Sequence, residues 1–186
     1  GNIDDKNYIE KIKNLKNLPQ GIENSLKTEE LIQIFAKDFL SAKGSMFLGR
    51  GSSFPIALEG ALKLKELSYI HAEGYPAGEM KHGPLALIED GLPVIILAPK
   101  DKYFEKTISN MQEVIARGGK VLLISDKHDE VINENIRFKI EMPFIDELLN
   151  PFLLTIPLQL LAYHVALLKK CDIDKPRNLA KSVTVE

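Results

Sequence analysis

The stretch SMFLGRGSSFPIALEGALKLKELSYI, residues 45–70, joins a short apolar run to a glycine-containing turn and then to a helix-forming segment. The apolar run at 45–50 predicts a buried strand, and the alanine, leucine, lysine and glutamate of 55–71 predict a helix. The turn GRGSSFP (49–55) lies between the two. A strand, a turn and a helix in this order are the first unit of an α/β fold.

Similar units follow along the chain. Further apolar runs predict strands at 94–99, 120–125 and, more weakly, 137–142, and a helical pattern covers 102–117. Strands that are apolar throughout are typical of a parallel sheet covered on both faces. The sequence therefore predicts an α/β fold, a three-layer αβα sandwich with a mostly parallel, flavodoxin-like sheet.

Helical patterns also fill both ends of the chain. Two short polar helices are expected at 6–16 and 19–26, on either side of Leu18-Pro19, and a third is expected from an N-cap at Thr28 to a stop at Gly44. The apolar run 152–168 contains Pro157, Gln159 and His164 and is short for a bilayer span, so a buried or interface helix is expected. The expected division is 1–35 for leading helices or a linker, 36–177 for the main domain and 178–186 for a tail.

Composition narrows the classes of protein. The 186 residues contain 45% apolar residues and carry a net charge of −2, which describes one globular domain and disfavours nucleic acid or a membrane as partner. One cysteine, Cys171, forms no internal disulfide and suits a reducing, cytoplasmic compartment. The four histidines lie far apart and match no zinc spacing, so neither a metal nor a cofactor is expected.

A charged stripe marks the helix predicted at 55–71. At 100° per residue Glu59, Lys63 and Glu66 fall within one narrow arc, and apolar side chains fill most of the remainder. One interpretation is an exposed ladder of ion pairs, since Glu59 precedes Lys63 by four residues. The other is a carboxylate held against an apolar wall and tuned as a general base. These residues alone do not decide between the two interpretations.

The next segment, EGYPAGEMKHGP (73–84), holds three glycines and two prolines and predicts an irregular loop. His82 either caps a turn before Pro84 or holds an imidazole for proton transfer. The GRGSSFP turn has no Walker lysine–serine pair and fails the G-x-G-x-x-G pattern at Phe54. It is either a plain turn with an N-cap or a site for an anion or a sugar hydroxyl.

The segment DIDKPRNLAKSVTVE (172–186) has no periodicity, and it is either disordered or a docked tail that carries the amine of Lys181 into a site. Together, the motifs FLGRG, PIALEGALKLKELSYIHAEGYPAGEMKHGPLALI, PLQLLAYHVAL and PRNLAKSVTVE closely resemble the C-terminal end of the glucosamine-6-phosphate synthase family. These enzymes are also called glutamine:fructose-6-phosphate aminotransferases. The resemblance covers nearly all of Phe47–Glu186 and implies the second of two sugar isomerase (SIS) domains.

The resemblance also implies roles for individual residues. Glu66 matches the carboxylate that moves a proton between sugar C1 and C2, and Lys63 matches the lysine that positions substrate and carboxylate. His82 matches a histidine that reaches into the neighbouring subunit's site and assists ring opening, which implies a homodimer. Lys181 matches the lysine that attacks the C2 carbonyl or promotes ring opening, and Ala180 lines the sugar.

Two parts of the family have no counterpart among these residues. They are the nucleophilic cysteine of the glutaminase domain and the serine/threonine loop of the first SIS domain, which holds the sugar phosphate. The expectation is therefore the C-terminal isomerase subdomain of an enzyme that makes glucosamine 6-phosphate from fructose 6-phosphate and glutamine, inactive by itself. The alternative is a stand-alone SIS module that binds sugar phosphates, or a deglycase-like isomerase.

Overall fold

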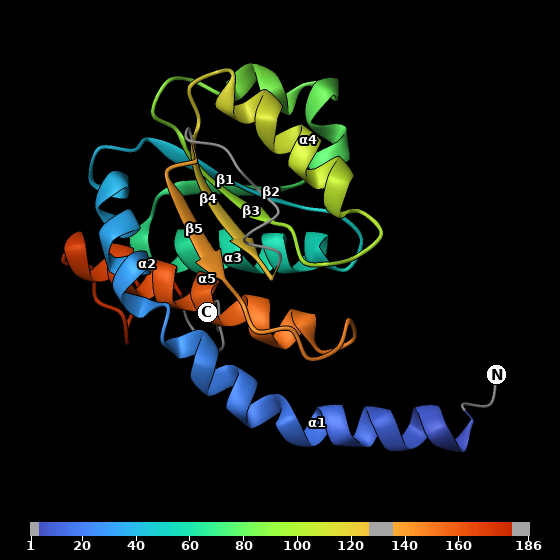
Figure 1. Cartoon of the computed structure of the whole chain (residues 1–186). Coiled ribbons are helices and arrows are strands. Elements are labelled where there is room, and N and C mark those ends of the chain that lie inside the picture. Colours follow the sequence, from blue (N-terminus) through green and yellow to red (C-terminus); the bar gives the residue numbers. More distant parts are fainter. Residues whose placement is uncertain (1–3, 127–135, 180–186) are drawn as a thin grey trace, which may run out of the picture.

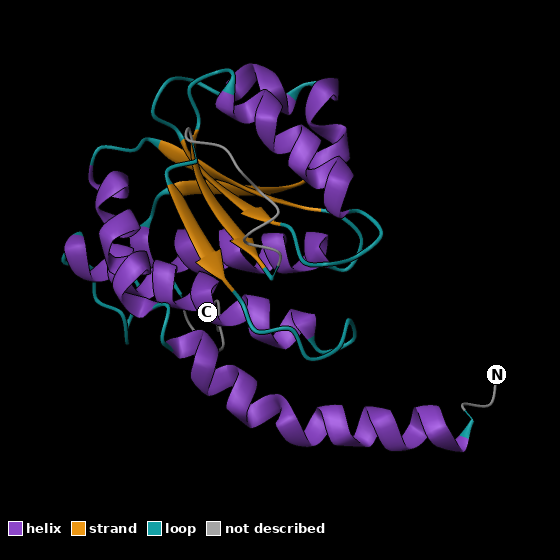
Figure 2. Cartoon of the chain, viewed as in Figure 1, coloured by secondary structure: helices purple, strands orange, loops and turns teal. Residues whose placement is uncertain are grey.

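A five-stranded parallel sheet lies at the centre of the chain, and helices cover both of its faces (Figure 1, Figure 2). The computed structural model describes residues 4–126 and 136–179. The strands are β1 (Gly44–Gly49), β2 (His71–Pro76), β3 (Pro93–Leu97), β4 (Lys120–Ser125) and β5 (Phe138–Glu141), in the order β2-β1-β3-β4-β5. Every neighbouring pair is parallel. The predicted three-layer αβα sandwich is confirmed.

The helices divide between the two faces of the sheet. They are α1 (Asp5–Leu26), α2 (Glu29–Ala36), α3 (Ser53–Ser68), α4 (Phe104–Ile115) and α5 (Asn150–Leu168), with short 3₁₀ helices η1 (Lys37–Leu40), η2 (Ala77–His82) and η3 (Pro84–Leu87). One hydrophobic cluster joins α2, α3 and α5 to the sheet, and a second joins α4 and η2 to its other face. On β3, Ile95 and Leu97 belong to the first cluster, whereas Val94 and Ile96 belong to the second. Burial on both faces explains why the central strands are apolar throughout.

Strand β2 extends into the segment 73–84 that was predicted to be irregular, and that prediction is wrong for residues 73–76. The strand pairs with β1 in the register Gly44↔His71 to Gly49↔Pro76 and forms one edge of the sheet. Gly74 packs on the backbone of α3, since an added Cβ would lie 2.9 Å from the Cα of Leu58. An edge strand tolerates proline and polar residues, which hid β2 from the apolar pattern.

The N-terminal helices also differ from the prediction. Residues 5–26 form one helix that continues through Pro19, and α1 bends as it leaves the body of the protein (Figure 1). Proline removes one backbone hydrogen bond and crowds the preceding turn, which is the usual cause of such a bend. Thr28 precedes α2, but its hydroxyl donates to the carbonyl of Ser25 and does not cap the helix. Gly44 begins β1, so it does not end the preceding helix.

Asp146 ties the outer part of α1 to the loop before α5. Its carboxylate accepts hydrogen bonds from Lys11 Nζ at 2.6 Å, from Asn14 Nδ2 at 3.0 Å and from the backbone of Leu148 at 3.0 Å. The pKa of Asp146 is lowered, above all by the hydrogen bond from Lys11, although burial opposes the change. The buried carboxylate therefore stays ionised and holds α1 in place.

Helix α5 belongs to the core of the fold. By length and composition its 19 residues are sufficient to cross a membrane, but half of its most apolar window is buried inside the protein. It packs against α3, α2 and α1. His164 is buried on this helix, and its Nε2 lies 2.9 Å from Glu29 Oε1 on α2. The predicted role as a buried or interface helix is confirmed.

Candidate active site

The charged stripe of α3 is present and forms one connected group. Lys63 Nζ donates to Glu66 Oε2 at 2.8 Å and lies 3.8 Å from Glu59 Oε1. The three side chains are 36%, 33% and 29% exposed for Glu59, Lys63 and Glu66. They are neither deeply buried nor fully solvated, so a ligand from outside the chain can reach the Glu66 carboxylate.

The charges of the stripe reinforce one another. The pKa of Lys63 is raised, chiefly by its hydrogen bond to Glu66, with Glu59 adding to the effect and burial opposing it. Lys63 therefore remains an ammonium at neutral pH, and it orients the Glu66 carboxylate instead of accepting a proton itself. Glu59 and Glu66 are thus the groups of the stripe that can accept a proton, and Glu66 is the one that Lys63 contacts more closely, at 2.8 Å against 3.8 Å.

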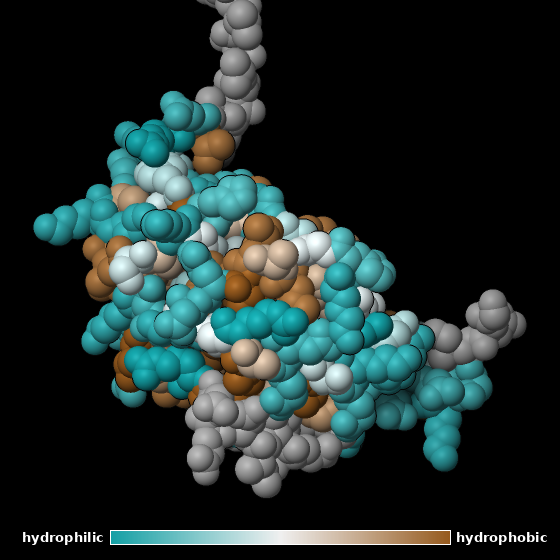
Figure 3. Space-filling view, turned by 90° about the horizontal axis from the view of Figure 1, so that it is seen from above, coloured by the Kyte–Doolittle hydropathy of each residue, from teal (hydrophilic) through white to brown (hydrophobic). Residues whose placement is uncertain are grey.

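Apolar side chains flank the stripe on the open side of α3. Leu58 is 45% exposed and Leu62 is 42% exposed, so part of the apolar surface of the helix is open to solvent. Figure 3, which looks from above onto the α4 side of the molecule, shows a mostly hydrophilic face that contains a hydrophobic area. Exposed leucines beside a charged stripe are typical of a surface that another body covers.

His82 is the last residue of η2, and Gly83 follows it at φ 144°, a conformation that favours glycine. Its Nδ1 lies 2.7 Å from Glu79 Oε2, and its side chain is 73% exposed. Within the described ranges 4–126 and 136–179, no hydrogen bond or ion pair joins His82 to Glu66. One copy of the chain therefore does not bring the two predicted catalytic groups into contact.

Two contacts fix η2 on the surface. Lys81 Nζ lies 3.0 Å from Glu113 Oε1 on α4. The guanidinium of Arg50 lies against Gly78, where an added Cβ would meet Nη2 at 2.9 Å, and Arg50 Nη1 also donates to Asn110 Oδ1 on α4 at 3.1 Å. The histidine is therefore presented to solvent from an anchored segment.

The predicted tail residues Ala180 and Lys181 lie outside the described residues. The segment before them contacts the end of α3, where the backbone N–H of Arg177 donates to the Tyr69 hydroxyl at 2.9 Å. The Arg177 guanidinium lies 4.1 Å from the centre of the Tyr69 ring. Tyr69 was missed because the helical pattern was expected to run on to residue 71, which concealed the end of α3 at Ser68.

The GRGSSFP turn joins β1 to α3 as predicted. The N–H of Ser53 donates to the carbonyl of Arg50 at 3.0 Å and that of Phe54 to Gly51 at 3.2 Å, while Pro55 has no N–H. An anion at a helix start needs free N–H groups. The turn therefore favours the interpretation as a plain connection over that as an anion site.

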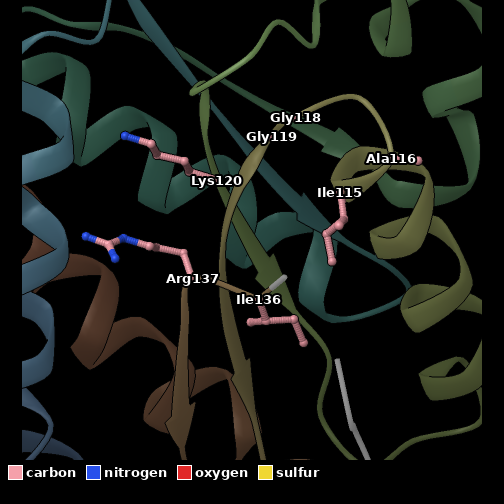
Figure 4. Close-up of a pocket in the computed structure, with 7 residues that line it drawn as sticks. All are labelled: Ile115, Ala116, Gly118, Gly119, Lys120, Ile136 and Arg137. Carbon is pink, nitrogen blue, oxygen red and sulfur yellow. The ribbon is translucent and has the colours of Figure 1, made fainter. Parts of the chain in front are cut away.

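A cavity of about 560 Å³ lies elsewhere, at the β4–β5 side of the sheet (Figure 4). It is lined by Ile115, Ala116, Gly118, Gly119, Lys120, Ile136 and Arg137. Lys120 and Arg137 extend to one side of it, and both already pair with Asp38, at 3.6 and 3.3 Å. The cavity contains none of the predicted site residues. Within residues 4–126 and 136–179, no three His, Cys, Asp or Glu side chains are grouped to hold a metal.

Comparison with known proteins identifies the family of the chain. The SIS domain family matches residues 38–169. Glutamine--fructose-6-phosphate aminotransferase [isomerizing] of Bartonella quintana (strain Toulouse) is 51% identical over 187 residues, which are 100% of this chain and 31% of the relative. The same enzyme of Salmonella typhi is 55% identical over 172 residues, or 92% of this chain and 28% of the relative.

A solved structure is similar over nearly the whole chain. The C-terminal domain of glucosamine-fructose-6-phosphate aminotransferase from Francisella tularensis superimposes with a TM-score of 0.89 and 44% identity, over 93% of this chain and 49% of that one. The chain thus spans less than a third of the length of the Bartonella and Salmonella relatives. On these matches the chain belongs to the SIS domain family and corresponds to the C-terminal part of the glutamine–fructose-6-phosphate aminotransferases.

Proposed function

We propose that the chain acts as the second isomerase domain of an enzyme that makes glucosamine 6-phosphate from fructose 6-phosphate and glutamine. The observation that carries this proposal is the Lys63–Glu66 pair, held at 2.8 Å on the half-exposed face of α3. The name of the relatives states that they use glutamine and fructose 6-phosphate and that they isomerise. The stripe supplies a carboxylate and a fixed cation, which are the groups that such an isomerisation needs.

In this proposal Glu66 takes the proton from C1 of the sugar and returns it to C2, so the carboxylate is unchanged at the end. Lys63 holds that carboxylate in one orientation through a charge-assisted hydrogen bond. Its raised pKa supports this role, because a lysine that kept losing its proton would not anchor an anion. Ala180 and Lys181 are proposed to line the sugar and to act on the C2 carbonyl or on ring opening.

The proposal assigns His82 to the site of a neighbouring subunit, where its imidazole assists ring opening. Two observations support this assignment, namely the 73% exposure of the side chain and the anchoring of η2 by Lys81 and Arg50. In a two-fold symmetric dimer each chain would give its His82 and receive that of the partner. A homodimer is therefore part of the proposed function.

The sugar phosphate is proposed to be held by another SIS domain, because the N–H groups at the start of α3 are already used. Binding energy from a phosphate usually orients the reacting carbons, so the chain by itself should isomerise poorly. A cytoplasmic location and the division into a linker (1–35), an SIS domain (36–177) and a catalytic tail (178–186) complete the proposal.

A chimaera tests the proposed function. The matching part of the Bartonella aminotransferase is replaced by this chain, and the purified protein is assayed for glucosamine 6-phosphate formed from fructose 6-phosphate and glutamine. We expect turnover within about tenfold of the parent, because a domain of this identity keeps the same fold. An inactive chimaera that folds and dimerises like the parent would contradict the proposal.

Measurements on the isolated chain distinguish a domain of a larger enzyme from a stand-alone module that binds sugar phosphates. Titration with fructose 6-phosphate in a calorimeter should give no binding if the chain is one domain of a larger site. Millimolar or tighter binding by the isolated chain would instead indicate a stand-alone sugar-phosphate module.

A further inference from the structure

We propose that Tyr69 and Arg177 form a clamp that fixes the C-terminal segment to the end of α3, and that Tyr69 is thereby a positioning residue for the tail that contains Lys181. The role given to Lys181 rests on the proposed function, whereas the clamp rests on contacts between described residues. The clamp consists of the hydrogen bond from the Arg177 N–H to the Tyr69 hydroxyl and of the guanidinium stacked on the ring.

The two contacts act on different parts of Arg177. The hydrogen bond, at 2.9 Å, fixes its backbone, and the stack, at 4.1 Å from the ring centre, fixes its side chain. A planar guanidinium over an aromatic ring adds attraction that a point-like ammonium provides less well. Two contacts from one residue to one ring define both where the segment lies and how it is oriented.

The backbone of Tyr69 shows why a tyrosine is unexpected at this position. Tyr69 has φ 62° and ψ 16°, in the left-handed region, and its N–H donates to the carbonyl of Lys65 at 3.0 Å where α3 ends. Glycine or asparagine adopts this conformation more readily. The ring and hydroxyl of Tyr69 thus lie at a backbone position that glycine would adopt with less strain.

The chain turns sharply on both sides of the clamp. Lys170, just after α5, has φ 57°, and Asn178, just after Arg177, has φ 61°. The first turn carries the chain out of α5, and the second changes its direction immediately after the contact with Tyr69. The segment 171–177 thus runs from the end of α5 to the end of α3.

The clamp places the anchored end of the tail near the stripe. Tyr69 follows Glu66 by three residues, about 4.5 Å along a helix axis. Lys181 is four residues beyond Arg177, which an extended chain spans in at most about 14 Å. Without the clamp the nearest fixed point is Cys171, whose N–H donates to the carbonyl of Ala166 at 2.9 Å, ten residues before Lys181. Because the effective concentration of a tethered group falls roughly as the −3/2 power of tether length, shortening the tether from ten to four residues raises it about fourfold.

The clamp is tested on the chain itself by amide exchange measured with NMR. Tyr69→Phe removes the hydroxyl alone, and Arg177 N–H exchange should become about fivefold faster, the loss of one ordinary hydrogen bond. Tyr69→Gly removes both contacts and also relieves the backbone, so exchange should rise further without a lower melting temperature. Tyr163→Phe, at a half-exposed tyrosine on α5, is the matched control and should change neither. Equal Arg177 exchange in the wild type and in Tyr69→Phe would overturn the clamp.

The positioning role is tested in the chimaera by separating kcat from KM. Tyr69→Gly should lower kcat about fourfold and leave KM within about twofold. Tyr69→Phe retains the stacking of Arg177 on the ring, so its kcat should lie between those of Tyr69→Gly and the wild type. Unchanged kcat in Tyr69→Gly, or a change in KM alone, would overturn the positioning role. If the wild-type chimaera were inactive, the proposed function would fail, yet the exchange rates would still decide whether the clamp exists.

Discussion

The substitution Glu66→Gln separates a catalytic carboxylate from a structural one, because the two roles predict effects on different measurements. Glutamine keeps the shape of the side chain, and its carbonyl oxygen can still accept the hydrogen bond that Lys63 donates. It cannot take up a proton from a sugar carbon. We therefore expect almost no loss of stability and a large loss of turnover.

The stability effect follows from exposure. Both partners of the Lys63–Glu66 pair are close to one-third exposed, and partly exposed ion pairs contribute roughly 0.2–1 kcal/mol. For a chain of this length that corresponds to a melting temperature lower by at most about 4 °C. The raised pKa of Lys63 means that the contribution of the pair is present below the ordinary lysine pKa of 10.5 and is lost as pH rises through the raised value. At neutral pH the full, small contribution is measured.

The effect on turnover is much larger. Removing a general base costs about 10²–10⁴ in rate, which is about 3–5 kcal/mol of barrier. The assay is the formation of glucosamine 6-phosphate by the chimaera, with thermal melting of the same samples. Glu29→Gln, which removes the carboxylate that contacts His164 Nε2, is the control and should keep normal turnover.

Two outcomes would refute the assignment of Glu66. One is near-normal turnover in Glu66→Gln. The other is a loss of turnover accompanied by a fall in melting temperature of about 10 °C or more, which would make Glu66 a structural residue.

Three further predictions concern the interface, the N-terminal helix and the edge strand. Equal amounts of a Glu66→Gln chimaera and a His82→Ala chimaera, mixed so that subunits exchange, should regain about a quarter of the unmutated chimaera's activity. The reason is that half of the dimers then contain one intact shared site out of two. No recovery would indicate that both residues act in the site of their own chain. Asp146→Asn should cost roughly 2 kcal/mol at pH 7. That stability is fully present above the unfolded pKa of 3.8 and is lost as pH falls from there through the lowered pKa of Asp146, so the melting curves of the variant and the wild type should converge over that range. Gly74→Ala should lower stability by about 1–3 kcal/mol in denaturant unfolding, because its Cβ meets the α3 backbone at Leu58; unchanged stability would show that β2 can shift.

The buried strands could be predicted from the sequence because both of their faces are covered. Apolar runs at 94–99 and 120–125 match β3 and β4 closely, since such strands need apolar residues at every position. The edge strand β2 was missed because half-exposed positions carry the polar residues, glycine and proline that usually mark a loop. Pro19 was interpreted as a break, whereas α1 accommodates it with a bend.

The site was predictable only in part, for a different reason. The helical spacing grouped Glu59, Lys63 and Glu66, and the structure confirms that grouping. The spacing alone did not decide between an ion-pair ladder and a general base, because that choice depends on what covers α3. The hydrogen bond from the Arg177 backbone N–H to the Tyr69 hydroxyl spans 108 positions in the chain, and no local pattern indicates it.

The bend in α1 gives the helix a mechanical property. From Pro19 to Asp5 the helix measures about 21 Å, so a 10° change at the bend sweeps its tip through about 4 Å. Asp146 holds this outer part of the helix at Lys11 and Asn14. The group that holds it is a carboxylate, and acid removes its negative charge. A small change of angle at Pro19 would therefore displace Tyr8 and Ile9, the exposed side chains near the N-terminal end of α1. The Asp146 carboxylate restrains that displacement.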